Sequence, residues 1–520
     1  MKIKKLLIAL LSMVCLCGVS ALVSCGGEDT KKPTHICRGE YFDDVTHHWM
    51  ICKICNEPKA KEEHKDDGKG SCSVCSYPVA PTAGIVYALS SDGTYAEVVK
   101  YDSKVKRVRI ADTYEGVPVK GIRKDVFKDK FITEITLPGS ITSIGSGAFT
   151  NCTKLEKVYI EDLASWCSIS FGNTESNPIY HAKKLYLNNE LISALNIPNG
   201  VTELSAHAFV NCETITSVQI PSTVTSVRAS TFTGCVNLQG VYITDIVAWS
   251  QLSFESADGN PLYYARKLYL NGELVTDWVI PEEITSIGSY VFAYCENMRF
   301  NEANGCKYLG KANNPYYAFV EPKDRTATTY TIHENTEIIA DSAFAECEVM
   351  ESIVIPDSVY SIGKQVFYSC DNLLTVKIGD NVKTIDDKAF FNCRRLESIK
   401  IPDSVTTLGE RVFYNCKGMV TAVIGEGIKT LTEYTFFACD LLENVVISSS
   451  VTSIKSYVFN GCPNMTNVYY KGDAAAWKKI TVGAFNPDLM TSTIYYYNEE
   501  TSSTTLTNWY YDTNGEIVVW

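Results

Sequence analysis

The sequence predicts a mainly β protein that folds as a solenoid, preceded by a small Cys-rich module. Three observations predict this architecture. The motif Phe-x-x-Cys recurs ten times between Phe149 and Cys462, and from Phe344 onward six copies follow at intervals of 23 residues. Apolar residues ahead of each motif alternate with polar ones, as in a short β-strand. A unit this short cannot bury its own apolar face, so it must stack on its neighbours.

The first element along the chain is an export signal. Three lysines within the first five residues precede an apolar run over residues 6–19, which is too short to span a bilayer comfortably. Small residues before Cys25 resemble the lipobox of bacterial lipoproteins, which implies cleavage before Cys25 and lipidation of its thiol. The alternative is an ordinary secretory signal. We expect residues 1–24 to be the signal peptide and residues 25–34 a tether, with the lipid anchor as the sole membrane contact.

The next element, residues 35–75, is predicted to be a zinc-ribbon-like module. Cys52-x-x-Cys55 and Cys72-x-x-Cys75 are 16 residues apart, within the range typical of zinc ribbons. Two such thiolate pairs can bind one Zn²⁺ tetrahedrally. The alternative is two disulfides, because exported chains meet oxidising surroundings. Zinc in this module is the one cofactor that the sequence suggests.

Two short elements connect the module to the array. Residues 76–84 contain two prolines and are predicted to be a stiff linker. Residues 85–105 place Asp92-Gly93 between alternating apolar residues, which is a hairpin signal. We expect this hairpin to cap the first coil.

The unit over residues 396–416 illustrates how each coil should be built. Ile399 and Ile401 alternate with polar residues and should share the inner face of a strand. Gly409 is expected to allow a tight bend, and the segment that ends at Cys416 to close the coil as a helical or 3₁₀ turn. The recurring cysteine is expected to be a small buried hydrophobe with a free thiol, because stacked side chains rarely meet the torsion of a disulfide.

The solenoid is predicted over residues 106–472, with insertions at about 161–195, 244–278 and 301–330, and a C-terminal Trp module and tail at 473–520. The first two insertions align, with Trp166 and Trp249 at equivalent positions 83 residues apart. The third is a partial copy that keeps an Asn-Pro pair at Asn314. The last module should cover the exposed end of the array. The aromatic residues of these insertions serve either packing or ligand binding.

Three classes of function are disfavoured by the sequence. A net charge of −13 over 520 residues repels nucleic acid and anionic lipid headgroups. The sequence contains no G-x-S-x-G, H-E-x-x-H or phosphate-binding glycine loop. We therefore predict that the protein is not an enzyme. The alternative is a hydrolase or redox protein with an unrecognised site.

The repeats themselves resemble a known family. Segments such as IPDSVTTLGERVFYNC, IPDSVYSIGKQVFYSC and ISSSVTSIKSYVFNGC are similar to the BspA-type leucine-rich repeat, over roughly residues 106–497. The resemblance implies a right-handed leucine-rich repeat solenoid with a parallel sheet on its concave side. It also implies a role in adhesion or protein binding at the bacterial cell surface or envelope.

The candidate contact face consists of strand positions that should point outward. They include Lys157, Tyr159, Gln219, Tyr242, Thr375, Lys377, Ser398, Lys400 and Tyr469. A long face of this kind suits a protein or an extended polymer better than a small metabolite. We expect an extracellular protein or matrix ligand as the partner, with no nucleic acid. The alternative partner is a glycan or cell-wall polymer bound by the Tyr/Trp insertions.

Overall fold

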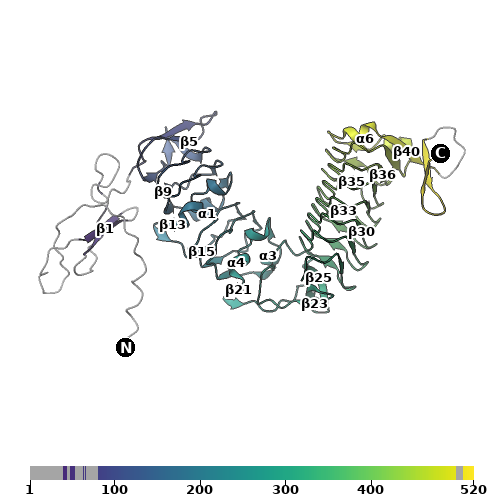
Figure 1. Ribbon diagram of the computed structural model, residues 1–520, viewed down its shortest axis with the longest axis horizontal. Coiled ribbons are helices and arrows are strands. Elements are labelled where there is room, and N and C mark those ends of the chain that lie inside the picture. The colour runs from purple at the N-terminus through teal and green to yellow at the C-terminus, as the bar shows by residue number, and fades with distance from the viewer. Residues whose placement is uncertain are drawn as a thin grey trace. The chain divides into compact units, whose positions relative to one another are not determined.

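The computed structural model describes residues 39–43, 47–52, 62, 63, 65, 80–498 and 507–519 (Figure 1). It confirms the predicted mainly β solenoid, because short strands of successive coils pair in parallel. The chain divides into two compact units. The first comprises Met1–Tyr242 with Asp258–Ala265, and the second comprises Ile243–Ala257 with Arg266–Trp520.

The described part of the predicted Cys-rich module is one antiparallel sheet. It consists of β1 (Gly39–Asp43), β2 (His47–Cys52) and β3 (Glu62–Glu63). Cys52 ends β2, opposite Gly39. The other predicted zinc ligands, Cys55, Cys72 and Cys75, lie outside the described residues, as does Cys25.

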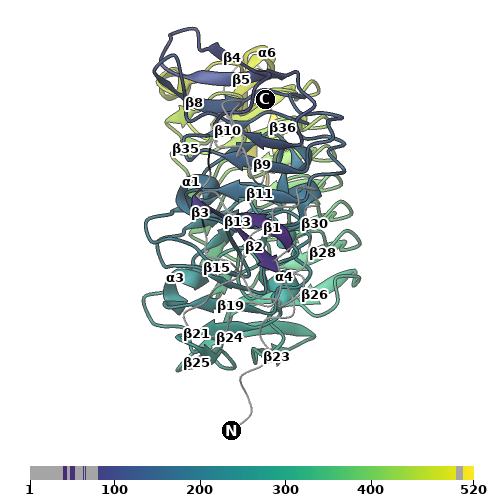
Figure 2. The ribbon, with the colours of Figure 1, turned by 90° about the vertical axis from the view of Figure 1, so that its left-hand side faces the viewer.

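The first unit holds the start of the array. Its strands are β4 (Ile85–Leu89), β5 (Ala96–Tyr101), β6 (Arg107–Arg109), β7 (Thr113–Tyr114), β8 (Val117–Ile122), β9 (Glu134–Leu137), β10 (Ser143–Ile144), β11 (Lys157–Ile160), β12 (Ser170–Phe171), β13 (Leu185–Leu187), β14 (Glu190–Leu191), β15 (Ala194–Asn196), β16 (Glu203–Leu204), β17 (Ser217–Gln219), β18 (Ser226–Val227) and β19 (Gly240–Ile243). Its helices are α1 (Leu163–Cys167), α2 (Ile179–Ala182) and α4 (Leu262–Ala265), with a 3₁₀ turn at Thr174–Ser176. β4 and β5 form an antiparallel hairpin, whereas β9, β11 and β13 are parallel rungs (Figure 2).

The second unit holds the regular part of the array. Its strands are β20 (Ser253–Phe254), β21 (Leu268–Leu270), β22 (Glu273–Leu274), β23 (Asn301–Ala303), β24 (Cys306–Lys311), β25 (Asn314–Pro322), β26 (Thr329–Thr331), β27 (Ile338–Ile339), β28 (Ser352–Val354), β29 (Ser361–Ile362), β30 (Thr375–Lys377), β31 (Thr384–Ile385), β32 (Ser398–Lys400), β33 (Thr407–Leu408), β34 (Thr421–Val423), β35 (Thr430–Leu431), β36 (Asn444–Ile447), β37 (Ser453–Ile454), β38 (Asn467–Tyr470), β39 (Thr481–Val482), β40 (Thr493–Tyr497), β41 (Asn508–Tyr511) and β42 (Ile517–Val519). Its helices are α3 (Ile246–Ser250), α5 (Ala474–Trp477) and α6 (Pro487–Thr491), and a 3₁₀ turn at Ala257–Gly259 lies at the boundary.

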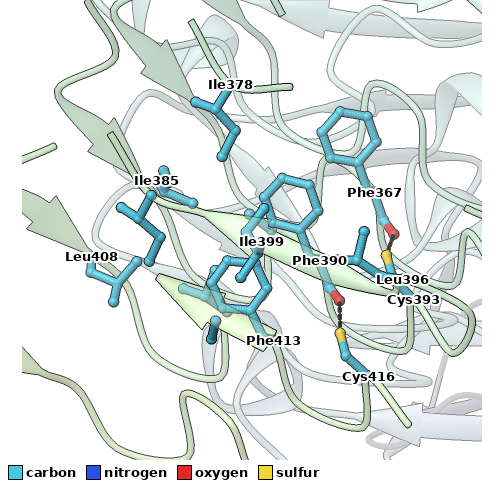
Figure 3. Close-up of a cluster of buried hydrophobic side chains, with 14 of the residues drawn as sticks. Phe367, Ile378, Ile385, Phe390, Cys393, Leu396, Ile399, Leu408, Phe413 and Cys416 are labelled. Atoms are coloured by element: carbon cyan, nitrogen blue, oxygen red, sulfur yellow. Dashed lines mark hydrogen bonds between the residues drawn. The ribbon is translucent and has the colours of Figure 1, made fainter. Parts of the chain in front are cut away.

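The core of the second unit is a column of stacked phenylalanines. From Phe344 to Phe459 the rings of consecutive coils lie nearly parallel, with centroids 4.9–5.6 Å apart. Figure 3 shows Phe367, Phe390 and Phe413 in this column. The aliphatic residues predicted to point inward, such as Ile399, are fully buried beside it. Each ring covers the next, so a coil gains its buried area from its neighbours.

The recurring cysteines are buried and free, as expected. The Sγ–H of Cys393 donates to the carbonyl oxygen of Phe367 over 3.1 Å, which joins one coil to the coil before it (Figure 3). The thiol therefore fills a small apolar space and also satisfies one main-chain acceptor.

Two expectations about the coil were wrong in detail. The segment before Cys416 is a series of turns rather than a helix, because Arg411 and Asn415 adopt left-handed φ angles of +56° and +60°. Gly409 is needed for close approach rather than for a special bend. A Cβ there would lie 2.3 Å from the backbone nitrogen of Asp387.

The insertion at about 301–330 also differs from the aligned copies. The segment from Asn314 forms the long strand β25, which pairs with β24 on one side and β27 on the other. In the first insertion the residues after the Asn-Pro pair form the helix α2 instead. The shared pair therefore does not fix the local structure.

Candidate functional site

Two sheets of the second unit, β26-β28-β30 and β32-β34-β36-β38-β40-β41-β42, follow each other along the stack, with β30 beside β32. Their outer faces carry two rows of side chains. In β28 and β30 the middle residue points inward, and the first and third residues point outward. Pairing places Ser352 opposite Thr375 and Val354 opposite Lys377. The row of first residues is uncharged and polar throughout. It comprises Thr329, Ser352, Thr375, Ser398, Thr421, Asn444, Asn467 and Thr493.

The row of third residues divides into an open and a covered part. The open strip, as we call it, comprises Thr331, Val354, Lys377 and Lys400, all of which are exposed. Val354 keeps 58 % of its surface exposed, so the strip also offers an apolar side chain. Lys377 and Lys400 form no ion pair within the described part of the chain. The predicted exposure of Thr375, Lys377, Ser398 and Lys400 is confirmed.

A C-terminal hairpin covers the other part of that row. β41 continues the sheet beside β40, and β42 pairs back on β41. Trp509 of β41 is fully buried and packs with Val446 and Tyr469. Its Nε1–H donates to the carbonyl oxygen of Tyr470 over 3.0 Å. The expectation that Tyr469 is exposed was therefore wrong, because the hairpin lies over it.

The first unit has a more closely packed face. Tyr159 was expected to be exposed but retains only 6 % of its surface, because the ring of Tyr186 packs 5.0 Å away. Lys157 is half-buried, and its Nζ lies 3.2 Å from Oε1 of Glu134. The other carboxylate oxygen of Glu134 accepts from Arg107 Nε at 2.9 Å. The three side chains satisfy one another across neighbouring strands, so they offer little to a partner.

Two further predicted residues of the first unit are exposed as expected. Gln219 of β17 lies opposite Tyr242 of β19, which keeps 37 % of its surface exposed. The predicted contact residues thus form separate groups. The structure brings together Thr375 and Lys377 of β30 with Ser398 and Lys400 of β32. Sequence reasoning missed Val354 and the covering role of Trp509. The aromatic cluster after the array was the available signal for the latter.

The Trp insertions are packed into the solenoid. Trp166 and Trp249 are buried, and each indole Nε1–H donates over 2.9 Å to a main-chain oxygen, of Ala208 and of Val291 respectively. Their rings are therefore occupied with packing, one of the two roles left open by the sequence.

Reactive groups are scarce in the described residues. They contain no group of three or more His, Cys, Asp or Glu side chains placed to bind a metal ion. Burial raises the pKa of Cys152 to about 12 and that of Cys212 to about 11, so these thiols are not poised as nucleophiles. Within the same residues, every helix is too short or too polar to cross a bilayer.

The fold and this face define a solenoid repeat scaffold, in which one sheet presents side chains and the opposite turns close each coil. The chain belongs to the family of the BspA type leucine-rich repeat region. The model of that family matches residues 120–239, 181–259, 265–381 and 360–491, with six copies.

Solved structures with a similar chain include leucine-rich repeat proteins. A leucine-rich cell surface protein from Faecalibacterium prausnitzii A2-165 is 23 % identical over 77 % of this chain and 97 % of its own, with a TM-score of 0.33. A leucine-rich repeat protein from Bacteroides ovatus ATCC 8483 is 20 % identical over 80 % and 98 %, with a TM-score of 0.29. The pneumococcal vaccine antigen PcpA is 13 % identical over 86 % and 97 %, with a TM-score of 0.32. No curated protein that was compared matches the chain.

Proposed function

We propose that the chain is a lipid-anchored scaffold at the bacterial cell surface, where it binds an extracellular protein through the open strip. The observation that carries the proposal is the exposed pair Lys377 and Lys400 in a chain of net charge −13. Uncharged hydroxyl groups of Thr375 and Ser398 stand beside them, and Val354 adds an apolar contact. Cationic, polar and apolar groups in one row suit a protein surface.

The size of the open strip fits an extended segment of a partner. Its four residues lie on successive coils, and neighbouring strands are ~4.8 Å apart, which gives a length of roughly 14 Å. A small molecule is usually bound in a concave pocket, whereas an open strip of this length suits a macromolecule. The two lysines favour a segment with carboxylates.

The experiment is a binding assay with the mature chain, residues 25–520, against a panel of purified extracellular matrix proteins. The double substitution Lys377→Glu/Lys400→Glu should lower the affinity at least tenfold. The matched control is Lys383→Glu/Lys429→Glu, which makes the same change of charge at exposed residues that precede β31 and β35 in the other sheets. Equal loss in both double variants would show that only net charge matters, and the proposal would fail.

The glycan alternative has less support. The rings of Trp166 and Trp249 are buried, and the hydroxyl of Tyr264 accepts from the backbone N–H of Gly234 over 2.8 Å. Stacking on a sugar needs an exposed ring face, which the two buried indoles do not offer. Glycan binding lost on Tyr263→Ala, with protein binding unchanged in Lys377→Glu/Lys400→Glu, would reverse the preference.

The zinc site at Cys52, Cys55, Cys72 and Cys75 stays a prediction, as does lipidation of Cys25. Two thiolate pairs at this spacing suit Zn²⁺, and the metal would staple a module too small for a large core. Metal analysis of the mature chain should give one zinc per molecule, lost in Cys72→Ser/Cys75→Ser. Absence of zinc together with four oxidised thiols would establish disulfides instead.

A further inference from the structure

The last Trp module is built like the two internal ones. In each, an aspartate side chain caps a short helix whose fourth residue is the tryptophan, as Asp473 caps α5 before Trp477. Asp162 and Asp245 do the same for α1 and α3. Each helix is followed by a strand of two residues, namely β12, β20 or β39. The three modules therefore share one order of elements, a capped helix followed by a strand that ends its sheet.

In both internal copies a following coil packs on the end of that helix. The residue after the tryptophan accepts a hydrogen bond from that coil through its carbonyl oxygen. Ser205 N–H donates to Cys167 O over 2.9 Å, and Gly288 N–H donates to Ser250 O over 2.8 Å. The tryptophan Nε1–H donates back to the same coil, to Ala208 O or to Val291 O. The phenylalanine that ends the short strand is buried in each case, with Phe254 completely inaccessible.

Within the described residues, no further coil packs on the last copy. The chain instead leaves α6 and enters β40, where the hairpin of β41 and β42 extends a different sheet. Val482, at the position of Phe254, is 38 % exposed, and Phe485 and Met490 are 61 % and 75 % exposed. With Asn460 and Pro487 they line an open cavity of about 470 Å³. At this end of the unit, the sheet that contains β40 is thus extended by the hairpin of β41 and β42. The outer edge of β39 pairs with no strand among the described residues.

The unclosed surface also offers main-chain groups. β39 pairs with β37 on one side, through Thr481 N to Thr452 O at 3.0 Å and Gly483 N to Ile454 O. Because donors alternate along a parallel strand, the N–H of Val482 points to the other edge. Phe485 ends a stack that begins at Tyr434, with its centroid 4.6 Å from that of Tyr457. An edge strand beside an exposed ring face is suited to strand addition.

The charges around this surface favour an acidic occupant. Lys478 and Lys479, which lie between α5 and β39, are exposed and form no ion pair within the described residues. Lys455 is exposed in the preceding coil. Two copies of the chain meeting end to end would bring these lysines together, which costs free energy. By contrast, the coil that follows the second internal module starts with Glu282 and Glu283.

We propose that this end face, formed by Trp477, Val482, Phe485 and Met490 with Lys478 and Lys479, binds an extended acidic segment of a partner protein. The segment adds a strand to the open edge of β39, next to the helix end on which a further coil packs in the internal modules. This site lies on different residues from the open strip and does not depend on the function proposed for it.

The test uses the mature chain and a peptide that copies residues 281–295, the coil that follows the second internal module, with Cys295→Ser. Its sequence supplies both the apolar spacing and two glutamates. We expect saturable binding with one peptide per chain, weakened at least tenfold by Val482→Pro, which removes the outward N–H. Proline is tolerated where an N–H faces the open edge of a sheet. Lys478→Glu/Lys479→Glu should weaken binding severalfold and reduce its salt dependence.

Two controls keep the result decisive. Lys377→Glu/Lys400→Glu should bind the peptide as the unchanged chain does, which separates this site from the open strip. A peptide with Glu282→Lys/Glu283→Lys should bind at least fivefold more weakly. If Val482→Pro lowers the melting temperature, its binding result is set aside, and Lys478→Glu/Lys479→Glu alone tests the proposal. Absence of saturable binding at millimolar peptide, or equal binding by all variants, overturns the proposal. Self-association abolished by Val482→Pro would also overturn it, in favour of a second copy.

Discussion

The Sγ–H of Cys416 donates to the carbonyl oxygen of Phe390, which lies one coil earlier and 3.2 Å away. The same bond joins Cys439 to Phe413 at 3.3 Å and Cys462 to Phe436 at 3.1 Å. The cysteine therefore acts as a link between coils, small enough to fit below the ring and able to satisfy a buried acceptor. Its recurrence follows from stacking and needs no redox role.

Thiol labelling tests this structural role. Iodoacetamide at pH 8 should leave the twelve free cysteines of the described residues unmodified in the folded protein and modify all of them in denaturant. The reason is burial, which removes access and raises the pKa of Cys306 to about 11 and that of Cys462 to about 12. Peptide mass spectrometry locates the label. Rapid native modification of Cys416 would contradict the structure.

The C-terminal hairpin should contribute strongly to the stability of the last coils. Trp509→Ala removes a fully buried indole and should lower the free energy of unfolding by about 3–5 kcal/mol. Trp509→Phe keeps most of the packing but loses the hydrogen bond to Tyr470, so about 1–2 kcal/mol is expected. Urea unfolding measures both. Native-like stability of Trp509→Ala would show that the hairpin does not cover Tyr469 and Val446.

Close approach of neighbouring coils at Gly409 predicts a specific sensitivity. Gly409→Ala would place Cβ 2.3 Å from Asp387 N, and a backbone atom cannot move aside as a flexible side chain can. Overpacking of this kind should cost about 1–3 kcal/mol. Lys455→Ala, at the same position two coils later and exposed, should change stability by less than about 0.5 kcal/mol. Equal thermal stability of the two variants would contradict the close approach.

Asp341 should make stability depend on pH. Burial raises the pKa of this carboxyl to about 7, and the carboxylates of Asp386 and Asp387 act in the same direction, against Lys364. The folded state thus holds the proton more tightly than the unfolded state does. Its stabilising effect is complete below about pH 4 and is lost as pH rises through about 7.

The substitution Asp341→Asn tests that dependence by removing the titrating group. Asn can still accept the hydrogen bond that Asp341 receives from the backbone N–H of Lys364 over 2.8 Å. The melting temperature of the variant, relative to the unchanged chain, should rise between pH 5 and pH 8. Asp380→Asn, at an exposed site, should show no such trend. A constant difference across this range for Asp341→Asn would refute the assignment.

The structure of the repeat units could be predicted because each unit contacts neighbours with the same pattern of residues. The interval between Phe367 and Phe390 recurs in the sequence, so one coil explains its successors, and the inward position of Ile399 follows from strand alternation. The outward positions could be predicted only where nothing else lies over the sheet. That condition holds at Lys377 and Lys400 and fails at Tyr469.

The failures share a physical cause, which is contact with residues outside the repeat. Tyr159 is covered by Tyr186 of an insertion, and Tyr469 is covered by Trp509 of the tail. The Asn-Pro pair at Asn314 enters a strand because β24 offers an antiparallel partner that the aligned copies lack. Such contacts join segments with unrelated sequence patterns, so no periodicity reveals them.

Among the described residues, the apolar contacts of the hairpin that covers Val446 and Tyr469 extend along the sheet as far as Val423. Gain or loss of one 23-residue unit upstream would leave that attachment unaltered and change the uncovered stretch by one strand spacing, ~4.8 Å. Recombination between units of equal length would thus change the length of the uncovered face in uniform steps and leave the covered end as it is.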